Sequence, residues 1–445
     1  MIKIDSRKVK EGDTFIALRG VNGDGHNYIE DAIKNGATKI IAEEGSYSKE
    51  TIIVKDTRLY LINYIEENIK PLVSDLKIIG ITGTNGKTTS CYLLYQALNK
   101  LNIKCGYIGT IGFYIDEKIK DLNNTTPELL DIYEMLIECK NQGCKFVVME
   151  VSSHALALRR VEGIEFDYAV FTNLTRDHLD YHKSMDNYAL AKQKLFYKIK
   201  DDGFAIVNND DEYKEYFLLP HNKNITYGIS DSDYKIDYFN STIDNTIFKI
   251  NDEEYHINLI GKHNVYNALI TIIILKTLDI DNKKIIEVLK NLEAPKGRMD
   301  KIKKETNTII VDYAHTPDAV EKALETVKEL EHNKIITVVG CGGNRDRTKR
   351  SLMGKVAASL SDYVIFTSDN PRNEDPMEIL NDIVKELDTS NYEIEENREL
   401  AIKKGIQQLT KNDILMVLGK GHENYQIIKN KKIHFDDKEI ILENL

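Results

Sequence analysis

The stretch Lys77-Ile78-Ile79-Gly80-Ile81-Thr82-Gly83-Thr84-Asn85-Gly86-Lys87-Thr88-Thr89 decides the fold of this chain. An apolar run short enough for a buried strand ends in glycines, and the segment that follows Lys-Thr-Thr has helical apolar spacing. A glycine turn between a strand and a helix holds phosphates, because backbone N–H groups and the helix N-terminus bind oxyanions. The sequence therefore predicts a nucleotide site, with contacts from Gly83, Thr84, Asn85, Gly86, Lys87, Thr88 and Thr89.

This loop departs from the common pattern at one position. The pattern has glycine where this chain has Ile81, and the glycines here are Gly83 and Gly86. The alternative is an ordinary glycine turn before a helix. The strand before the turn and the helix after it favour phosphate binding.

Length and charge limit the class of protein. A chain of 445 residues is too long for one ordinary core, so two to four domains are expected. Its 42% hydrophobic and 29% charged residues are typical of a soluble globular protein. The net charge of −11 argues against a protein that grips nucleic acid over a broad surface. An anionic substrate would need a local cluster of basic groups.

The cysteines and the apolar runs indicate a cytoplasmic protein. The five cysteines are an odd number and form no Cys-x-x-Cys pair, which suits a reducing compartment. No apolar segment of a signal peptide follows Met1, and the longest apolar run, near Leu269–Leu275, is too short to cross a bilayer. We expect no membrane partner.

Strand and helix patterns alternate along three parts of the chain, so we predict an α/β fold with three domains. Residues 1–76 form a small α/β unit, and residues 77–297 alternate strands and helices as in a doubly wound, mostly parallel sheet. Residues 221–260 alternate apolar and polar side chains, which predicts antiparallel strands at the sheet edge. A charged, breaker-rich joint at Ala294–Asp300 precedes a second α/β series over residues 298–445.

Polar residues follow several strands of the central part. Glu150 ends a buried strand, where a carboxylate can anchor the Mg²⁺ of a nucleotide or simply face water. The stretch Leu174–His182 holds two histidines and two aspartates, which form either a metal site or a solvated loop. By composition, Lys192 is a helix lysine on a solvent-facing side. Asn264 and Asn267 could contact a purine or cap a helix.

The C-terminal part repeats the design of strand followed by polar turn. Because the carboxyl ends of parallel strands share one rim, these turns should converge on one crevice. The four turns are Asp312–Asp318, Gly340–Asp346, Ser368–Pro376 and Gly419–Asn424.

Taken together, eight stretches of the chain resemble the Mur ligase superfamily, ATP-dependent amide-forming enzymes of peptidoglycan synthesis, and most closely its members that add the third amino acid; the resemblance runs from Asp5 to Asp437. The stretches are Asp-Ser-Arg at 5–7, Asp-Gly-His at 24–26, Gly-Thr-Asn-Gly-Lys-Thr-Thr at 83–89, Met-Glu-Val-Ser-Ser-His at 149–154, Asp-Tyr-Ala-His-Thr-Pro-Asp at 312–318, Gly-Cys-Gly-Gly at 340–343, Asp-Asn-Pro-Arg at 369–372 and Gly-Lys-Gly-His-Glu at 419–423.

The resemblance implies a reaction and a place in the cell. ATP phosphorylates the D-glutamyl carboxylate of UDP-N-acetylmuramoyl-L-alanyl-D-glutamate, and the amine of a diamino acid displaces phosphate from the acyl phosphate. Such an enzyme serves cell-wall biogenesis, and with it cell shape and cell division. The family expectation is a cytoplasmic monomer with an N-terminal UDP-binding domain, a central ATPase domain and a C-terminal amino-acid-binding domain.

The resemblance also implies residue roles in catalysis. Lys87 neutralises the transferred phosphate, Thr88 and Glu150 hold one Mg²⁺, and His178 holds a second. Lys192 matches a position that carries a carbamate supporting Mg²⁺, which reverses its reading as a solvent-facing lysine. The remaining matches are Arg298 and Asp312, where the C-terminal domain closes on the nucleotide, and Asn264 and Asn267 on the adenine side.

Substrate contacts follow from the same resemblance. The nucleotide-sugar would contact Ser6, Thr125, Thr126, Ser152 and Arg160, whereas Leu158 stands where relatives often have glutamine. The amino acid would contact Arg345, Asp369, Asn370, Arg372, Gly419 and Glu423. Arg372 matches the arginine that pairs with the distal carboxylate of meso-diaminopimelate, a bidentate contact that lysine cannot make.

Three alternatives stay open at this point. The same ligase could add L-lysine or another amine, including as a paralogue with a different acid. A ligase like folylpolyglutamate synthase shares the phosphate loop and the carbamate lysine, but should lack the N-terminal unit and the Asp-Asn-Pro-Arg stretch. A nucleotide-dependent switch would bind nucleotide and form no amide.

Overall fold

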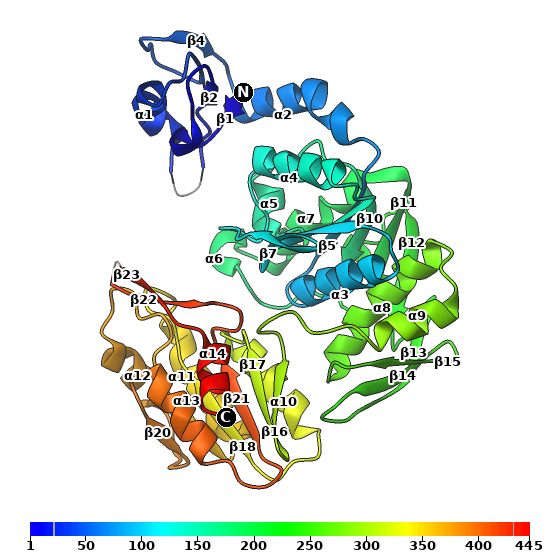
Figure 1. The fold of residues 1–445 in the computed structure, drawn as a ribbon, viewed down its shortest axis with the longest axis vertical. Coiled ribbons are helices and arrows are strands. Elements are labelled where there is room, and N and C mark those ends of the chain that lie inside the picture. The colour runs from blue at the N-terminus through cyan, green and yellow to red at the C-terminus, as the bar shows by residue number, and fades with distance from the viewer. Residues whose placement is uncertain (21–22, 430) are drawn as a thin grey trace. The chain divides into compact units, whose positions relative to one another are not determined.

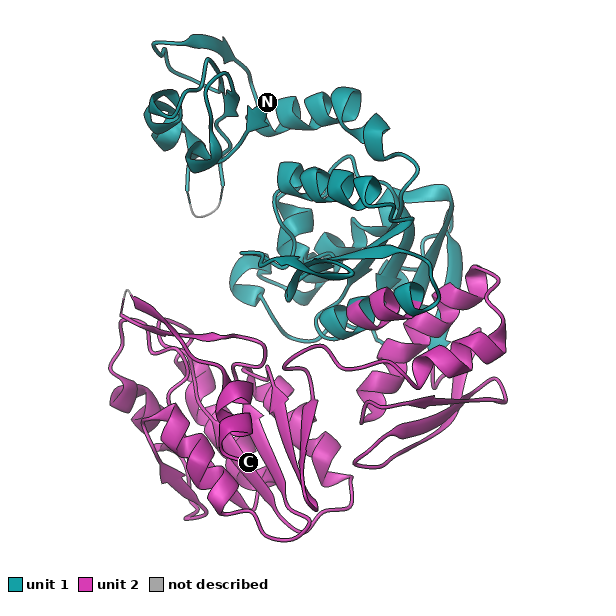
Figure 2. Ribbon diagram, viewed as in Figure 1, with its two compact units in different colours: residues 1–91, 98–227 teal, residues 92–97, 228–445 magenta. Residues whose placement is uncertain are grey.

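The computed structural model of the chain describes residues 1–20, 23–429 and 431–445. Two compact units make up the chain, residues 1–91 with 98–227 and residues 92–97 with 228–445 (Figure 2). Helix α3 (Lys87–Lys100) contributes residues to both. The predicted α/β class is confirmed, since strands and helices alternate through both units (Figure 1).

The N-terminal part is a small parallel sheet with its own core. Its strands lie in the order β1-β2-β3-β4 and pair in parallel throughout. Phe15 and Ile40 are fully buried in this core, as the apolar spacing predicts. The elements are β1 (Ile2–Lys3), β2 (Thr14–Ile16), α1 (Ile29–Lys34), β3 (Lys39–Ala42), β4 (Glu50–Ile53) and α2 (Thr57–Asn68), with 3-10 turns at Ser6–Lys8, Gly25–Tyr28 and Lys70–Val73.

The larger sheet of the first unit places the glycine turn at its centre. Eight strands follow the order β12-β11-β10-β5-β9-β6-β7-β8. Strand β5 pairs in parallel with β9 on one side and β10 on the other, so the loop after β5 has the ends of both as neighbours. The strands are β5 (Lys77–Thr82), β6 (Cys105–Gly109), β7 (Gly112–Ile115), β8 (Glu117–Lys120), β9 (Phe146–Glu150), β10 (Phe166–Phe171), β11 (Ile199–Asn208) and β12 (Lys223–Gly228).

Helices cover both faces of this sheet. Figure 1 shows α4 and α5 over one face and α3 over the other. Serines begin two of the helices: the Ser152 hydroxyl accepts from Ala155 N–H and the Ser184 hydroxyl from Asn187 N–H. The remaining helices are α4 (Leu129–Asn141), α5 (Ser153–Ala157), α6 (Leu179–His182) and α7 (Met185–Gln193), with 3-10 turns at Phe196–Lys198 and Lys214–Tyr216.

The second unit begins with three antiparallel strands, β13 (Tyr234–Ser241), β14 (Thr246–Ile250) and β15 (Glu253–Ile257). The antiparallel prediction for residues 221–260 is therefore confirmed here but wrong for β12, which pairs in parallel with β11. The pairing partner decided this, because β12 continues the parallel ladder of β11, and alternation within one segment does not indicate strand direction. Helices α8 (Lys262–Thr277) and α9 (Asn282–Leu289) follow.

The C-terminal sheet has six strands in the order β16-β17-β21-β18-β19-β20, parallel except for the edge strand β16. Side chains of its strands alternate between two cores, one with α10–α12 and one with α13 and α14. The six strands are β16 (Asp300–Lys304), β17 (Asn307–Asp312), β18 (Ile335–Val339), β19 (Tyr363–Phe366), β20 (Tyr392–Ile394) and β21 (Ile414–Leu418), and the helices are α10 (Pro317–Lys328), α11 (Thr348–Leu360), α12 (Pro376–Val384), α13 (Arg398–Gln407) and α14 (Asp437–Glu443). Strands β22 (Tyr425–Ile428) and β23 (Lys431–His434) form a separate antiparallel pair.

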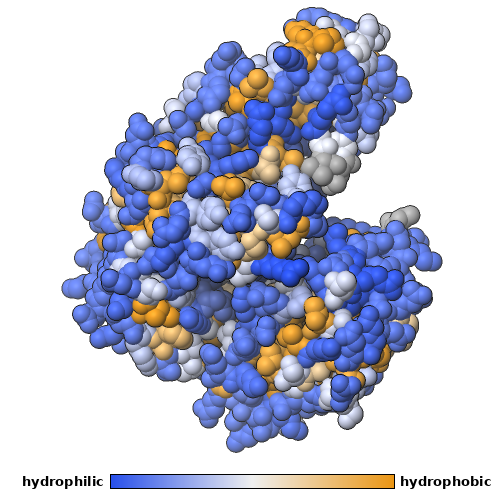
Figure 3. Space-filling model, turned by 180° about the vertical axis from the view of Figure 1, so that it is seen from behind, coloured by the Kyte–Doolittle hydropathy of each residue, from blue (hydrophilic) through white to orange (hydrophobic). Residues whose placement is uncertain are grey.

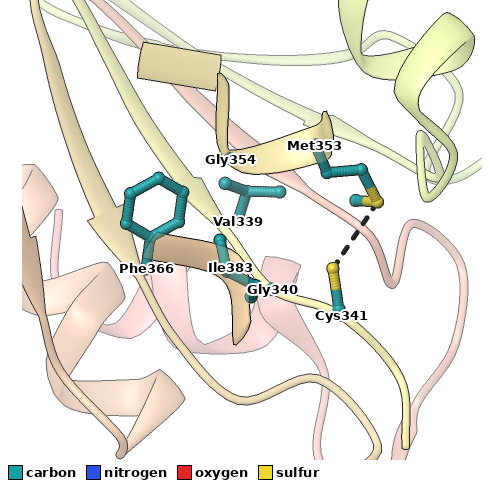
Figure 4. A pocket seen from close by; sticks show the side chains of 7 residues that line it. All are labelled: Val339, Gly340, Cys341, Met353, Gly354, Phe366 and Ile383. Carbon is teal, nitrogen blue, oxygen red and sulfur yellow. Dashed lines mark hydrogen bonds between the residues drawn. The ribbon is translucent and has the colours of Figure 1, made fainter. Parts of the chain in front are cut away.

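Apolar side chains fill the space behind the glycine turn that follows β18. Val339, Met353, Phe366 and Ile383 line a pocket there that has no room for a water molecule (Figure 4). A Cβ on Gly340 would lie 2.0 Å from the Thr367 carbonyl oxygen, so the β18 and β19 turns need glycine to approach this closely. This packing fixes the two turns and offers no ligand site.

The surface is mainly hydrophilic. The face drawn in Figure 3 shows scattered apolar residues among charged and polar ones. Among the described residues, no helix is long and apolar enough to cross a membrane.

Candidate active site

The glycine turn after β5 lies against the end of β10. Gly83 has φ +148°, and a Cβ there would lie 1.9 Å from the Thr172 hydroxyl, so only glycine fits. That hydroxyl donates to the Asn85 carbonyl at 2.7 Å. The Lys87 ammonium donates to the carbonyl oxygens of Gly83 and Thr84, each at 2.9 Å. The lysine is thus folded over the loop, where a phosphate would meet its charge.

The end of β9 brings a buried carboxylate to the start of α3. Glu150 is fully buried, and its Oε2 accepts from the Thr88 hydroxyl at 2.9 Å. Its Oε1 accepts from the Tyr107 hydroxyl at 2.6 Å and from Thr110 N–H at 2.8 Å. Burial raises the pKa of Tyr107 well above its ordinary value, which keeps this phenol a donor. All these donors are uncharged, so the carboxylate is fixed in place with its negative charge available to a cation.

Lys192 is buried, and the interpretation of it as a solvent-facing lysine is wrong. Its side chain is 1% exposed, and its Nζ donates to the Gly83 carbonyl at 2.7 Å and lies 4.4 Å from the centre of the Tyr188 ring. Composition could not show this, because α7 packs its C-terminal half under the phosphate loop. Desolvation, with the nearby charge of Lys87, lowers the pKa of Lys192 well below its usual range. The amine is therefore biased toward its neutral, nucleophilic form.

Histidines gather beside this lysine. The ring of His178 lies 4.7 Å from that of His154, whose centre lies 5.5 Å from the ring of His182. Desolvation lowers the pKa of all three, that of His182 to about 4. The His178 side chain is 46% exposed, and the backbone φ of this residue is +52°. In the described part of the chain, no group of three or more His, Cys, Asp or Glu side chains is arranged to hold a metal ion.

Four of the five residues predicted to contact the nucleotide-sugar lie near the end of β9, where Thr126 bonds directly to Glu150. The Thr126 hydroxyl donates to the Glu150 carbonyl at 2.8 Å and accepts from Ser152 N–H at 3.0 Å. The Thr125 and Thr110 hydroxyls are 3.1 Å apart, and the Arg160 guanidinium donates to the Thr126 carbonyl at 3.3 Å. The fifth, Ser6, is buried in the N-terminal part, where its carbonyl accepts from the Asn35 amide at 2.9 Å.

In the second unit, Arg298 and Asp312 flank the start of the C-terminal domain. The Arg298 guanidinium lies 4.8 Å from the centre of the Tyr313 ring, and its Nε is buried with no hydrogen-bond partner. Asp312 accepts from the N–H groups of Met299 at 2.7 Å and Ala314 at 2.9 Å, and burial raises its pKa. The unpartnered Nε is a donor that an anionic ligand could satisfy.

Asn264 and Asn267 are both buried on α8. The Asn264 amide donates to the Ile260 carbonyl at 2.8 Å, and the Asn267 amide donates to the Asn264 carbonyl oxygen at 3.0 Å. Neither caps the helix, because Gly261 is the N-cap, so the capping alternative is wrong.

The predicted amino-acid contacts converge at the carboxyl edge of the C-terminal sheet. The Asn370 amide donates to Glu423 Oε2 at 2.9 Å, and a Cβ on Gly419 would lie 3.0 Å from Asp369 Oδ2. The Arg372 Nη1 donates to the Gly343 carbonyl at 2.8 Å. A Cβ on Gly342 would lie 2.9 Å from Arg372 Nη1 and 3.8 Å from Arg345 Cγ, so both arginines border the same glycine turn.

Sequence reasoning missed several residues that support the predicted site residues within each unit. Lys420 is fully buried between Asp369, Asn370 and Glu423, and its place in a Gly-Lys-Gly turn after a strand was the signal that could have found it. Tyr107 and Thr110, which fix Glu150, carry no local signal, because only the pairing of β6 with β9 brings them to it.

Comparison with known proteins covers the whole chain. Family models match residues 1–76 (Mur ligase family, catalytic domain), 81–275 (Mur ligase middle domain) and 297–421 (Mur ligase, glutamate ligase domain). The UDP-N-acetylmuramoyl-L-alanyl-D-glutamate–2,6-diaminopimelate ligase of Clostridium perfringens is 44% identical over 100% of this chain and 94% of its own. The ligase of that name from Fusobacterium nucleatum is 44% identical over 99% and 92%. A solved structure of a ligase of that name has a TM-score of 0.71 at 33% identity and covers 100% of this chain and 94% of its own.

Proposed function

Since the chain belongs to the Mur ligase family of ATP-dependent amide-forming enzymes, we propose that it adds meso-diaminopimelate to UDP-N-acetylmuramoyl-L-alanyl-D-glutamate through an acyl phosphate. The observation that carries the proposal is the group of Arg345, Arg372, Asn370 and Glu423 around one edge of the C-terminal sheet. It offers cationic and anionic partners to a ligand that carries two carboxylates and two amines.

Phosphoryl transfer to a carboxylate needs concentrated positive charge, since both reactants are anions. Lys87 supplies one charge over the loop of Gly83. The Thr88 hydroxyl and the Glu150 carboxylate are oxygen ligands of the kind that Mg²⁺ prefers, and their 2.9 Å contact and burial fit that ion. When bound, Mg²⁺ would neutralise charge on the ATP phosphates.

Lys192 is suited to become a carbamate. A buried amine with a lowered pKa presents a lone pair, which can attack the carbon of CO₂. The N–C bond forms, a proton leaves the nitrogen, and the side chain becomes an anion beside the phosphate loop. His178 on the neighbouring loop would hold a second Mg²⁺ together with this group, because its lowered pKa keeps an imidazole nitrogen unprotonated.

The acceptor substrate would lie along Thr125, Thr126, Ser152 and Arg160, with its uridine end on the N-terminal domain at Ser6. Since the Thr126 hydroxyl donates to the Glu150 carbonyl and accepts from Ser152 N–H, an acid group held there would lie beside the transferred phosphate. Arg160 is the cation on this path, and it also pairs with Glu128 at 2.7 Å.

The C-terminal domain would complete the site by closing over the nucleotide, as many ligand-bound domains do. The Arg298 Nε, buried without a partner, is available for a phosphate oxygen. Asp312 would fix the strand end next to it, and Asn264 and Asn267 would lie on the adenine side. Closure excludes water, which would otherwise hydrolyse the acyl phosphate.

The charges of the amino-acid site favour diaminopimelate over lysine. The arginines, Lys420, Asp369 and Glu423 sum to one positive charge. Diaminopimelate with its attacking amine deprotonated carries one negative charge, whereas lysine in the same state carries none. We therefore place L-lysine as the second candidate. We also propose that the enzyme acts as a cytoplasmic monomer; its five cysteines are free and buried.

The test is phosphate release with ATP, Mg²⁺ and UDP-N-acetylmuramoyl-L-alanyl-D-glutamate, with meso-diaminopimelate or L-lysine in separate reactions. Release with diaminopimelate alone, together with a product of the tripeptide mass, supports the proposal. Release with lysine alone would support ligase activity but refute meso-diaminopimelate as the amino-acid substrate. No release with either, despite ATP binding, would favour a paralogue or a nucleotide switch.

A further inference from the structure

Lys420 is a fully buried lysine in the turn after β21. Its Nζ lies 3.2 Å from Glu423 Oε2, 3.4 Å from Asn370 Oδ1 and 3.8 Å from Asp369 Oδ1. Its exposure is 0%. A buried ammonium is costly unless it is paired, so its two carboxylate partners keep it in place.

The same contacts fix how the Asn370 amide faces the site. Its Oδ1 accepts from Lys420 and from Ile427 N–H at 2.9 Å, which leaves its Nδ2 to donate to Glu423 Oε2. Glu423 Oε2 therefore has two internal donors. The other oxygen, Oε1, accepts only a long 3.4 Å contact from the Tyr425 hydroxyl among the contacts described, so it is the oxygen left for a ligand ammonium.

We propose that Lys420 is a specificity-determining positioning residue, which sets the charge of the amine-binding side so that it favours a diamino dicarboxylic acid over a simple diamine acid such as lysine. This inference rests on the proposed function. Asp369, Glu423 and Lys420 together carry one negative charge, enough for one ligand ammonium.

The physical reason is the balance of charges at the far end of the ligand. Without Lys420, two buried carboxylates would face the ligand, and the extra negative charge would repel a ligand end that bears a carboxylate. A ligand end with an ammonium alone would be attracted instead. The ammonium of Lys420 thus acts against the wrong substrate, as repulsive groups do in specific sites.

The experiment compares two single substitutions of opposite charge. Lys420→Gln removes a positive charge, and Glu423→Gln removes a negative one. The readout is the ratio of kcat/KM for meso-diaminopimelate to that for L-lysine, with the KM for ATP and the unfolding midpoint as further measurements. The matched control is Lys355→Gln, because Lys355 pairs with Glu386 at 2.8 Å in the same domain but is half exposed.

Lys420→Gln should lower the ratio by about tenfold or more, with the KM for ATP unchanged. Glu423→Gln should raise the ratio, since the distal ammonium of lysine would lose the Glu423 carboxylate and lysine has no distal carboxylate to hold it instead. Lys420→Arg keeps the positive charge and should retain the wild-type ratio, and Lys355→Gln should also retain it. If Lys420→Gln does not fold, Glu423→Gln decides: a ratio that falls or stays constant overturns the inference.

Two other results are also decisive. A folded Lys420→Gln variant with an unchanged ratio, or with an equal loss for both amino acids, would show a purely structural lysine. Failure of the wild-type enzyme to release phosphate with either amino acid would instead refute the proposed function, which the wild-type reactions establish before any variant is compared.

Discussion

The Nζ of Lys192 donates to the carbonyl of Gly83 at 2.7 Å, so the buried amine of α7 is tied to the phosphate loop. The Lys87 ammonium donates to the same carbonyl at 2.9 Å. Two lysines on one carbonyl oxygen repel each other, which adds to burial in lowering the pKa of Lys192. Conversion of one of them to an anion would turn that repulsion into attraction.

Replacement of this lysine tests its chemistry. Lys192→Ala should reduce phosphate release on the order of 100-fold, because an anion that supports the reacting charges is lost. Short carboxylic acids added to the variant should restore part of the activity, since they can occupy the space of the missing carbamate. Lys194→Ala, two residues along and exposed, is the control and should behave as wild type. Rescue by uncharged alcohols of the same size would contradict the carbamate.

Glu150 is expected to serve both stability and metal affinity. Glu150→Gln replaces one carboxylate oxygen with an NH2 group, which faces either the Thr88 hydroxyl or the donors Tyr107 and Thr110; this donor–donor contact should lower the free energy of unfolding by about 1–3 kcal/mol. The Mg²⁺ concentration for half-maximal phosphate release should rise by about tenfold or more. Chemical denaturation and Mg²⁺ titration measure the two effects. Glu138 is exposed, so the control Glu138→Gln should change neither the unfolding free energy nor the Mg²⁺ requirement. An unchanged Mg²⁺ requirement in Glu150→Gln would show that Glu150 is not a metal ligand.

Gly297 packs its backbone against that of Gly421 at the joint before the C-terminal domain. A Cβ on Gly297, where φ is +69°, would lie 2.1 Å from the Gly421 carbonyl carbon. Gly297→Ala should therefore cost about 3 kcal/mol or more, because backbone has to move. Gly143 has φ +82° with nothing within 4 Å, so Gly143→Ala should cost only the left-handed penalty of about 1–2 kcal/mol. Equal denaturation midpoints for Gly297→Ala and Gly143→Ala would show that the backbone around Gly297 relaxes at little cost in free energy.

Arg350 joins the two loops that carry Arg345 and Arg372. It is 1% exposed and pairs with Glu374 at 2.8 Å and Asp382 at 2.9 Å, and Glu374 also accepts from the backbone N–H of Asn344. Arg350→Met should lower the free energy of unfolding by about 3 kcal/mol, since it breaks a buried ion pair, and should raise the KM for the amino acid more than it lowers kcat.

The control shares one of its partners. Arg347 pairs with the same Asp382 at 2.9 Å but is 59% exposed, so Arg347→Met should cost less than about 1 kcal/mol. Urea denaturation and initial rates at varied diaminopimelate compare the pair. If the two variants behave alike, Arg350 does not hold the loops in place.

Arg372 tests the identity of the amino acid. Arg372→Lys keeps the charge but removes the planar fork, so kcat/KM for meso-diaminopimelate should fall by about tenfold or more while the rate with L-lysine changes little. Initial rates with both amino acids give the ratio. An equal loss with both would mean that this arginine, at φ +53°, supports the loop and does not read a carboxylate.

The sequence by itself determined the elements and the chemistry at their ends. The apolar run before Gly83 forms β5, and Glu150, Asp312 and Gly419 lie at or just after strand ends as predicted. These signals are local, because strand length, glycine turns and helical spacing depend on neighbouring residues. Eight motifs in order also indicated that the chain belongs to the Mur ligase family, and the comparisons confirm this membership.

Only the tertiary structure decided the environments of the charged side chains. Lys192 looked like a solvent-facing helix residue, yet the packing of α7 under the β5 turn buries it. Lys420 gained its environment from Asp369 and Asn370 in another turn and from Glu423 in its own turn. Strand β12 joined a parallel ladder where its alternation suggested an antiparallel edge. Burial and pairing depend on residues distant in sequence, so composition and periodicity cannot supply the desolvation that makes one lysine nucleophilic and another a fixed counter-charge.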